Sequence, residues 1–177
     1  NAVPVETKDF SWDMTVNLSH NKNMVKKLSN QTYSVNYIPQ AEAGIAGNSG
    51  VYLQRIMEGC PIGQFYTYEW AGYNEQGVSQ FYVHDPETGE RTGETTTSPK
   101  ETDQTKTGSA QPKLTYGWNN TLNWKKWSLN LFFQGTVGNK IFNALRAQYN
   151  SVNLISQGKN VLKEALTDQK YGDVNAQ

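Results

Sequence analysis

Residues 11 to 23, SWDMTVNLSHNKN, begin with a strict alternation of apolar and polar positions. The apolar positions are Trp12, Met14, Val16 and Leu18, and the residues between them are Asp, Thr and Asn. Because successive side chains of a β-strand point to opposite faces, this pattern predicts a strand with one apolar and one polar face. Such a strand suits either a soluble sandwich, with its apolar face on the core, or a membrane barrel, with that face on lipid.

The segments KLTYGWNNTLNW (113–124) and WSLNLFFQG (127–135) alternate in the same way. Their apolar positions are Leu114, Tyr116, Trp118, Leu122 and Trp124 in the first segment, and Trp127, Leu129, Leu131 and Phe133 in the second. Only Asn120 interrupts the apolar face of the first segment. Lys125 and Lys126 alone separate the two, which predicts a tight antiparallel hairpin. Since two-residue turns favour Asn or Gly, a turn one or two residues longer is the alternative.

The polar faces of these three segments favour the membrane alternative. They consist almost wholly of Ser, Thr, Asn, Gln and Gly, whereas the outer face of a soluble sandwich commonly carries charged residues. Residues 10–20 and 114–124 also match the ~9–11 residues of a tilted transmembrane strand, while soluble strands are nearer ~5–6 residues. The predicted lipid-facing residues are Trp12, Met14, Val16, Leu18, Trp118, Trp124, Trp127, Leu129, Leu131 and Phe133.

Tryptophans and lysines at the predicted turn are typical of a membrane interface. Trp124 and Trp127 flank the turn on the apolar side, and the two lysines lie beyond them. Rings at the end of an apolar band, with charges just outside it, resemble the aromatic girdle of a transmembrane barrel. The alternative is that these rings cover the edge of a soluble core.

The remaining segments predict long excursions at the other end of the sheet. Short aromatic and β-branched runs broken by Gly and Pro predict several short strands before residue 112, and residues 83–89 read as a hairpin end in which Gly89 takes a left-handed conformation. Residues 94–112 are polar and are expected to be mobile. Helical spacing after residue 140 predicts one or two short helices.

Transmembrane barrels have short periplasmic turns and long extracellular loops, so the lysine turn is expected on the periplasmic side. We therefore divide the chain into a barrel strand entered from a periplasmic turn (1–21), a long extracellular excursion with short strands (22–112), a transmembrane β-hairpin (113–137) and an extracellular loop with short helices (138–177). The predicted fold class is all-β, with antiparallel strands of a large transmembrane β-barrel.

The composition of the chain argues against a nucleic-acid partner and against a disulfide framework. The 177 residues are 36% hydrophobic, and sixteen basic residues, spread along the chain, balance sixteen acidic ones, so nothing favours a nucleic-acid partner. The mean hydropathy of −0.71 is low for a globular core, although aromatic residues reach 12%. Cys60 is the single cysteine; it cannot form an intrachain disulfide and is interpreted as a structural thiol.

Motifs for catalysis are missing from the sequence. His20 and His84 are the only histidines, and no nucleophile elbow, zinc-binding helix motif or phosphate-binding loop occurs. We expect no enzyme activity, no catalytic residue, no metal site and no cofactor. His84 and Asp85, beside a Pro-Glu-Thr-Gly turn, are interpreted as solvated structure.

Aromatic residues at positions 65–73 form the one candidate binding surface. Tyr66, Tyr68, Trp70 and Tyr73 would stack against sugar rings or peptides, while the alternative is that these rings pack a small core of the loop itself. A soluble β-rich carbohydrate-binding module that uses this Tyr/Trp cluster is therefore the alternative function.

Three segments resemble one family, the SusC/RagA family of TonB-dependent outer-membrane transporters of Bacteroidetes. IMEGCPIGQFYTYEWAGYNEQG (56–77) is similar to its EGxPIGxFYGYxxAGxxxxG segment, and PKLTYGWNNTLNWKKWSLNLFFQGTVGNKIFN (112–143) to its PKxxxGxxNxxxYKxFxLxxxFxGxxGNxIxN segment. FSWDMTVNLSHNKNMVKKL (10–28) resembles its FxWxxxxNxSxNKNxVxxL strand. Thr67 and Trp127 depart from the pattern, where the family has Gly and Phe, but both keep the local chemistry.

The resemblance implies a barrel in the bacterial outer membrane, in contact with its lipid and with extracellular loops, that takes up nutrients. It implies oligosaccharide or peptide as the substrate, a SusD-like surface lipoprotein as a partner, and coupling to the TonB complex through parts outside this chain. Three wall strands cannot close a barrel, so we expect the chain to be a piece of a longer protein.

Overall fold

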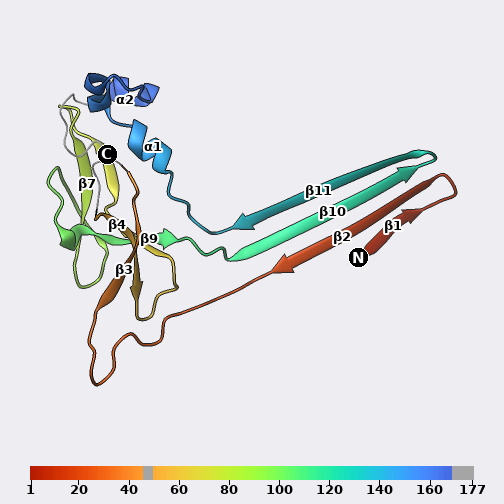
Figure 1. The fold of residues 1–177 in the computed structure, drawn as a ribbon, viewed down its shortest axis with the longest axis horizontal. Coiled ribbons are helices and arrows are strands. Elements are labelled where there is room, and N and C mark those ends of the chain that lie inside the picture. Colours follow the sequence, from red (N-terminus) through yellow and green to blue (C-terminus); the bar gives the residue numbers. More distant parts are fainter. Residues whose placement is uncertain (46–49, 169–177) are drawn as a thin grey trace.

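The computed structural model describes residues 1–45 and 50–168. A long, narrow sheet projects from a second region that holds two smaller sheets and the helices (Figure 1). The described residues thus form antiparallel sheets with a few short helices, as the predicted all-β class requires. None of these helices is long and apolar enough to cross a membrane.

The long sheet has the order β1-β2-β10-β11. Its strands are β1 (Ala2–Glu6), β2 (Phe10–Ser19), β10 (Leu114–Trp124) and β11 (Trp127–Val137). β2 and β11 each pair with β10 in an unbroken antiparallel register. Residues opposite each other share a face, so this register puts the alternating apolar positions of three strands on one side of the sheet.

β1 is the strand that the sequence did not predict. Val5 pairs with Trp12, and the register shifts between Ala2 and Val5. The turn between β1 and β2 lies at the same end as the lysine turn, because the Lys125 amide donates a 2.8 Å hydrogen bond to the Asp9 carbonyl. Trp124 pairs directly with Trp127, which confirms the two-residue turn rather than the longer one.

Asn120, the one polar residue on the apolar face, has a partner 108 positions away in the sequence. The indole nitrogen of Trp12 donates a 3.1 Å hydrogen bond to Asn120 Oδ1. Only 5% of Asn120 is exposed. A buried amide oxygen without a partner costs free energy, so the bond to Trp12 makes Asn120 tolerable on an apolar face.

Two smaller sheets lie outside the long sheet. The first sheet has the order β3-β4-β5-β9 and the second the order β6-β7-β8. Their bounds are β3 (Tyr37–Glu42), β4 (Tyr52–Met57), β5 (Gln64–Thr67), β6 (Trp70–Tyr73), β7 (Ser79–His84), β8 (Arg91–Thr96) and β9 (Thr105–Ser109). The buried apolar residues of the described chain are few, which agrees with the low hydropathy: Ala43, Ile45, Cys60, Phe65, Leu154 and Ala165.

Residues 94–112 carry regular structure, so the expectation of a mobile segment is wrong. The segment includes the end of β8, the short 3-10 helix η1 (Glu101–Asp103) and β9. Asp103 is 6% exposed, and its carboxylate accepts a 2.7 Å hydrogen bond from the Lys100 amide. Strand pairing and polar bonds of this kind order a segment that has no large apolar residue.

The predicted hairpin end is confirmed, since Gly89 has a φ of 71° between β7 and β8.

The predicted short helices follow β11. Two α-helices, α1 (Ala144–Tyr149) and α2 (Lys163–Asp168), agree with the expected one or two, and the 3-10 helix η2 (Val152–Gln157) between them was not predicted. Asn143 caps α1, because its side-chain oxygen accepts a 2.9 Å bond from the Arg146 amide. Residues 169–177 of the predicted last loop lie outside the described residues.

Backbone bonds join the long sheet to the second region where β9, β10 and β11 meet. The Lys113 amide donates to the Val137 carbonyl at 2.9 Å, and the Lys140 amide donates to the Ser109 carbonyl at 2.7 Å. The side-chain stems of the two lysines also pack on glycines, Lys113 on Gly138 and Lys140 on Gly108. The chain that leaves β11 is therefore held against the chain that enters β10.

We predict that Gly135→Ala destabilises the long sheet, because Tyr116 packs its ring on this glycine. A Cβ at position 135 would lie 2.6 Å from the Tyr116 hydroxyl oxygen, so the ring has to move. We expect a loss of about 1 kcal/mol in the free energy of unfolding of the intact protein, measured by denaturant titration in detergent micelles.

Gly117→Ala is the matched control on the neighbouring strand. A Cβ there meets the Phe132 ring at an ordinary distance of 3.6 Å, so its effect should stay within about 0.5 kcal/mol. Equal effects of the two substitutions would contradict the proposed packing of Tyr116.

Candidate functional site

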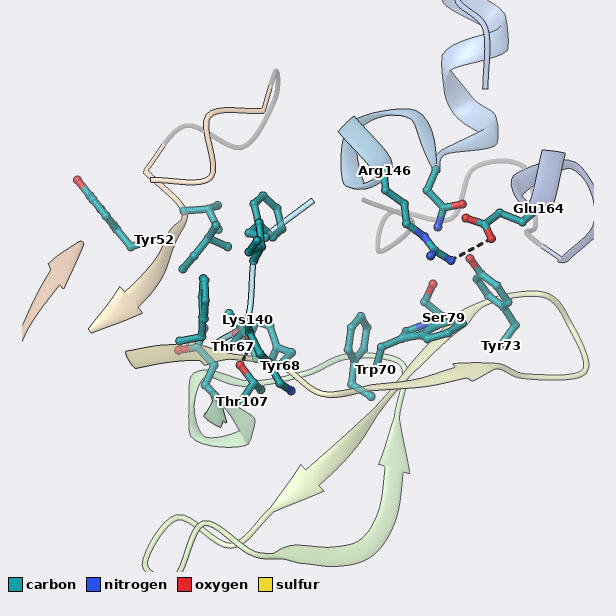
Figure 2. A pocket seen from close by; sticks show the side chains of 18 residues that line it. Tyr52, Thr67, Tyr68, Trp70, Tyr73, Ser79, Thr107, Lys140, Arg146 and Glu164 are labelled. Carbon is teal, nitrogen blue, oxygen red and sulfur yellow. Dashed lines mark hydrogen bonds and ion pairs between the residues drawn. The ribbon is translucent and has the colours of Figure 1, made fainter. Parts of the chain in front are cut away.

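A cavity of about 630 Å³ lies where both smaller sheets meet the chain that leaves β11. This is within the size range of sites for small molecules. The residues that line it are Val51, Tyr52, Leu53, Phe65, Thr67, Tyr68, Trp70, Tyr73, Ser79, Phe81, Gln104, Thr107, Lys140, Ile141, Phe142, Arg146, Asn150 and Glu164. Figure 2 shows these side chains around the cavity.

Aromatic residues of β6 and the segment before it form part of the cavity wall. Tyr68, Trp70 and Tyr73, three of the four residues predicted to bind substrate, line the cavity. The rings of Trp70 and Tyr73 have centroids 5.2 Å apart and meet at 74°, edge to face. They therefore form a corner and not a flat platform.

Tyr66, the fourth predicted residue, takes part in a different arrangement. The Arg55 guanidinium lies between the rings of Tyr66 and Tyr37, 4.3 Å and 4.1 Å from their centroids. It also donates to Gln104 Oε1 at 2.5 Å and to Glu101 Oε1 at 3.0 Å. Gln104 lines the cavity and Arg55 does not. Arg55 therefore positions a polar side chain of the cavity wall through its hydrogen bond to Gln104. A lone Arg in a strand offers no sequence signal for this role.

Charged and polar groups lie at two ends of the cavity. Arg146 of α1 and Glu164 of α2 form an ion pair of 2.9 Å beside Tyr73 (Figure 2). Lys140 lies near Thr67 and Thr107, whose hydroxyl groups are 2.9 Å apart. No local pattern in the sequence singles out Lys140, Arg146 or Glu164, because α1, α2 and the chain after β11 are brought to the aromatic wall only by the fold.

His84 is 4% exposed, so its interpretation as solvated structure is wrong. Its ring lies 3.1 Å from the Asp103 carbonyl oxygen and 3.2 Å from Glu69 Oε2. Glu69 also accepts two hydrogen bonds from Arg91, which stacks on the Tyr82 ring at 3.9 Å. This cluster ties the residue before β6 to β7, β8 and η1.

The Arg91 guanidinium lowers the pKa of the Glu69 carboxyl below its usual value of 4.5, mainly through the hydrogen bonds between them. Glu69 in turn raises the pKa of Arg91. The pair is therefore ionised at neutral pH and acts as a fixed cross-link. In the described part of the chain, no group of three or more His, Cys, Asp or Glu residues is arranged to hold a metal ion.

The residues predicted to face lipid lie together on one face of the long sheet. In the register, Val16, Trp118 and Phe133 form one row across the three strands, and the rings of Trp118 and Phe133 are 5.6 Å apart. Most members are exposed, from Leu131 at 40% to Trp127 at 77%. On the opposite face, Asn130 donates to Thr121 at 2.9 Å, while Phe132 is the large apolar exception.

The curated proteins to which this chain is similar are TonB-dependent receptors. TonB-dependent receptor P3 of Formosa agariphila is 31% identical over 158 residues, which cover 81% of this chain and 14% of the relative. TonB-dependent receptor SusC of Bacteroides thetaiotaomicron is 34% identical over 77 residues, 44% of this chain and 8% of that protein. The chain thus spans about one seventh or less of these curated relatives. No protein-family model matches it.

Solved structures of RagAB complexes share the fold. A chain of the RagAB peptide transporter aligns with a TM-score of 0.65 at 22% identity, over 96% of this chain and 18% of that one. A chain of the RagAB peptide importer in the closed-closed state aligns with a TM-score of 0.63 at 23% identity, over 84% of this chain and 15% of that one.

We predict that Glu69→Gln makes the smaller sheets open more readily, by a larger factor at pH 6 than at pH 3.5. A lowered carboxyl pKa contributes stability above about 4.5, the usual value, and that contribution is lost as the pH falls through the lowered pKa. For a partly exposed pair we expect protection of the β7 and β8 amides against hydrogen exchange to drop about threefold at pH 6. Glu94→Gln, which changes an exposed glutamate of β8, is the control. An effect of Glu69→Gln that is equal at both pH values would contradict the role of the ion pair.

Proposed function

Because the chain belongs to the SusC/RagA family of TonB-dependent transporters, we propose that its long sheet is part of the wall of an outer-membrane nutrient importer. The observation that carries this proposal is the unlike character of the two faces of that sheet. One is continuous and apolar, with Asn120 bonded to Trp12 as its only polar member, and the other consists mainly of small uncharged polar residues. The smaller sheets and helices would then be extracellular.

The apolar face fits lipid better than a soluble core. Leu129, Leu131 and Phe133 of β11 are each 40% exposed or more, and their sheet projects away from the rest of the described chain (Figure 1). Exposed patches of this extent are unfavourable in water and suit a membrane interaction. This argues against the soluble carbohydrate-binding module. Trp124 and Trp127 would lie at the periplasmic interface, beside the two short turns.

The polar face suits the inside of a wide barrel. Its hydroxyl and amide groups bond to one another across the strands, as Asn123 does with Ser11 at 3.2 Å. Uncharged polar groups of this kind remain hydrated in a water-filled lumen and place no charge in the path of a solute. The division into wall segments at 1–21 and 113–137 and extracellular segments at 22–112 and 138–177 follows from this orientation.

The cavity with Tyr68, Trp70 and Tyr73 is the proposed point of contact with substrate, an oligosaccharide or a peptide. It would lie in the extracellular part, where a solute arrives before it enters the barrel. A SusD-like lipoprotein is the proposed partner at this surface, and the TonB complex is the proposed source of energy. These roles belong to the whole transporter, of which this chain is a part. No covalent chemistry is required of it.

We predict that Val16→Lys impairs membrane insertion while Asn17→Lys does not. The two positions are adjacent on β2 but lie on opposite faces. A lysine on the lipid face should cost about 2 kcal/mol, whereas one on the lumen face stays hydrated. The readout is the amount of folded protein in the outer-membrane fraction, scored by heat-modifiable mobility in gels. Equal tolerance of both substitutions would contradict the assignment of the faces.

The importer function is tested by uptake into cells that express the intact protein. Cells that lack the protein should fail to take up a labelled oligosaccharide or oligopeptide too large for porins, and a protonophore should abolish uptake in cells that have it. A surface lipoprotein should co-purify with the protein in mild detergent. Normal uptake of both solute classes without the protein would overturn the proposal.

A further inference from the structure

The cavity beside Trp70 carries an inference that rests on the proposed function and narrows its substrate. Aliphatic and aromatic side chains make up most of its wall, including Leu53, Phe81 and Phe142. A sugar ring presents hydroxyl groups around its whole edge. Hydroxyl groups that lie against the aliphatic and aromatic part of this wall would lose hydrogen bonds to water, and only those near polar side chains such as Thr67, Ser79 and Gln104 would regain them.

The geometry of the corner formed by Trp70 and Tyr73 also favours an apolar side chain over a sugar ring. Trp70 and Tyr73 meet at 74°, so a flat sugar face could stack on only one of the two rings. A side chain inserted into the corner would touch both. Trp70 is 55% exposed, which makes the corner accessible from solvent. The corner therefore matches an aromatic or branched aliphatic side chain.

The charges along the cavity wall set a second requirement for the ligand, which concerns its charge. Arg146 and Glu164 neutralise each other in their 2.9 Å ion pair. Lys140, the third charged residue of the wall, makes no ion pair within the described chain, so the cavity has an excess of one positive charge. The stem of Lys140 lies on Gly108, which holds the ammonium group at the end of the cavity away from Arg146 (Figure 2). A ligand with a carboxylate complements this charge, and a neutral glycan does not.

We propose that this cavity binds a peptide through one large apolar side chain, packed into the corner that Trp70 and Tyr73 form, and one carboxylate, paired with Lys140. Arg55 is a positioning residue for the site, because it fixes Gln104 of the wall without touching the cavity itself. The site selects among peptides by side-chain size and by charge. Ile141 and Phe142, which also line the cavity, would contact the peptide backbone between these two groups.

The test measures binding to the intact protein in detergent micelles by calorimetry, with four probes. They are a pentapeptide with a central phenylalanine and a free carboxyl terminus, the same peptide with a central glycine, the phenylalanine peptide with an amidated terminus, and maltoheptaose. We expect the phenylalanine acid to bind at least tenfold more tightly than the glycine peptide and about fivefold more tightly than the amide. Maltoheptaose should bind at least tenfold more weakly than the phenylalanine acid.

Matched variants assign these differences to the cavity. Trp70→Ala should weaken binding of the phenylalanine acid at least tenfold, while Trp127→Ala, which removes an exposed tryptophan at the far end of the long sheet, should leave it unchanged. Lys140→Met should abolish the preference for the acid over the amide. Lys113→Met, which removes a lysine that packs on Gly138 in the same manner outside the cavity, should keep that preference.

Three outcomes would overturn the proposal. In the first, maltoheptaose binds more tightly than the peptides and Trp70→Ala abolishes that binding, which makes the cavity a carbohydrate site. In the second, peptides bind but no cavity variant changes their affinity. In the third, no peptide binds at millimolar concentration. Uptake of a solute by cells would still support the importer in each case, so the failure of this inference is distinguishable from failure of the proposed function.

Discussion

In-register antiparallel pairing of β2, β10 and β11 is the constraint on which the rest of the structure depends. A shift of one residue between two neighbouring strands would move every side chain of one strand to the opposite face. The observed register places Met14, Asn120 and Leu131 in one row and the small polar residues in the rows of the other face. The two short turns, joined by the bond from Lys125 to Asp9, close one end, so all longer connections leave from the other.

The second region is held together in a different way. Few apolar residues are buried there, and the strands are joined by charged side chains that contact several elements at once. Arg55 links β3, β4, β5 and the segment after η1 through two rings and two hydrogen bonds. Glu69, directly before β6, is bonded to Arg91 of β8 and lies 3.2 Å from the ring of His84 in β7. Arrangements of this kind leave the apolar side chains of the cavity wall available to a ligand.

Alternation along the chain was sufficient to predict the long strands and the hairpin, and helical spacing predicted the late helices, because these elements depend on local periodicity. β1 escaped prediction since AVPVE is short, contains a proline and does not alternate clearly. The polar segment 94–112 was misjudged because its order comes from pairing with β5 and β7, which a composition argument does not see. His84 was misjudged for the same reason, since its neighbours Asp103 and Glu69 are distant in sequence.

The sequence by itself therefore determined which face of each long strand is apolar, because side-chain direction in a strand follows from position alone. It also identified Tyr68, Trp70 and Tyr73 as a group, though not the corner that two of them form. Only the tertiary structure decided that Tyr66 stacks on Arg55, that Asn120 is matched by Trp12, and that Lys140, Arg146 and Glu164 reach the aromatic wall. Each of these depends on contacts between elements that lie far apart along the chain, and local periodicity carries no information about such contacts.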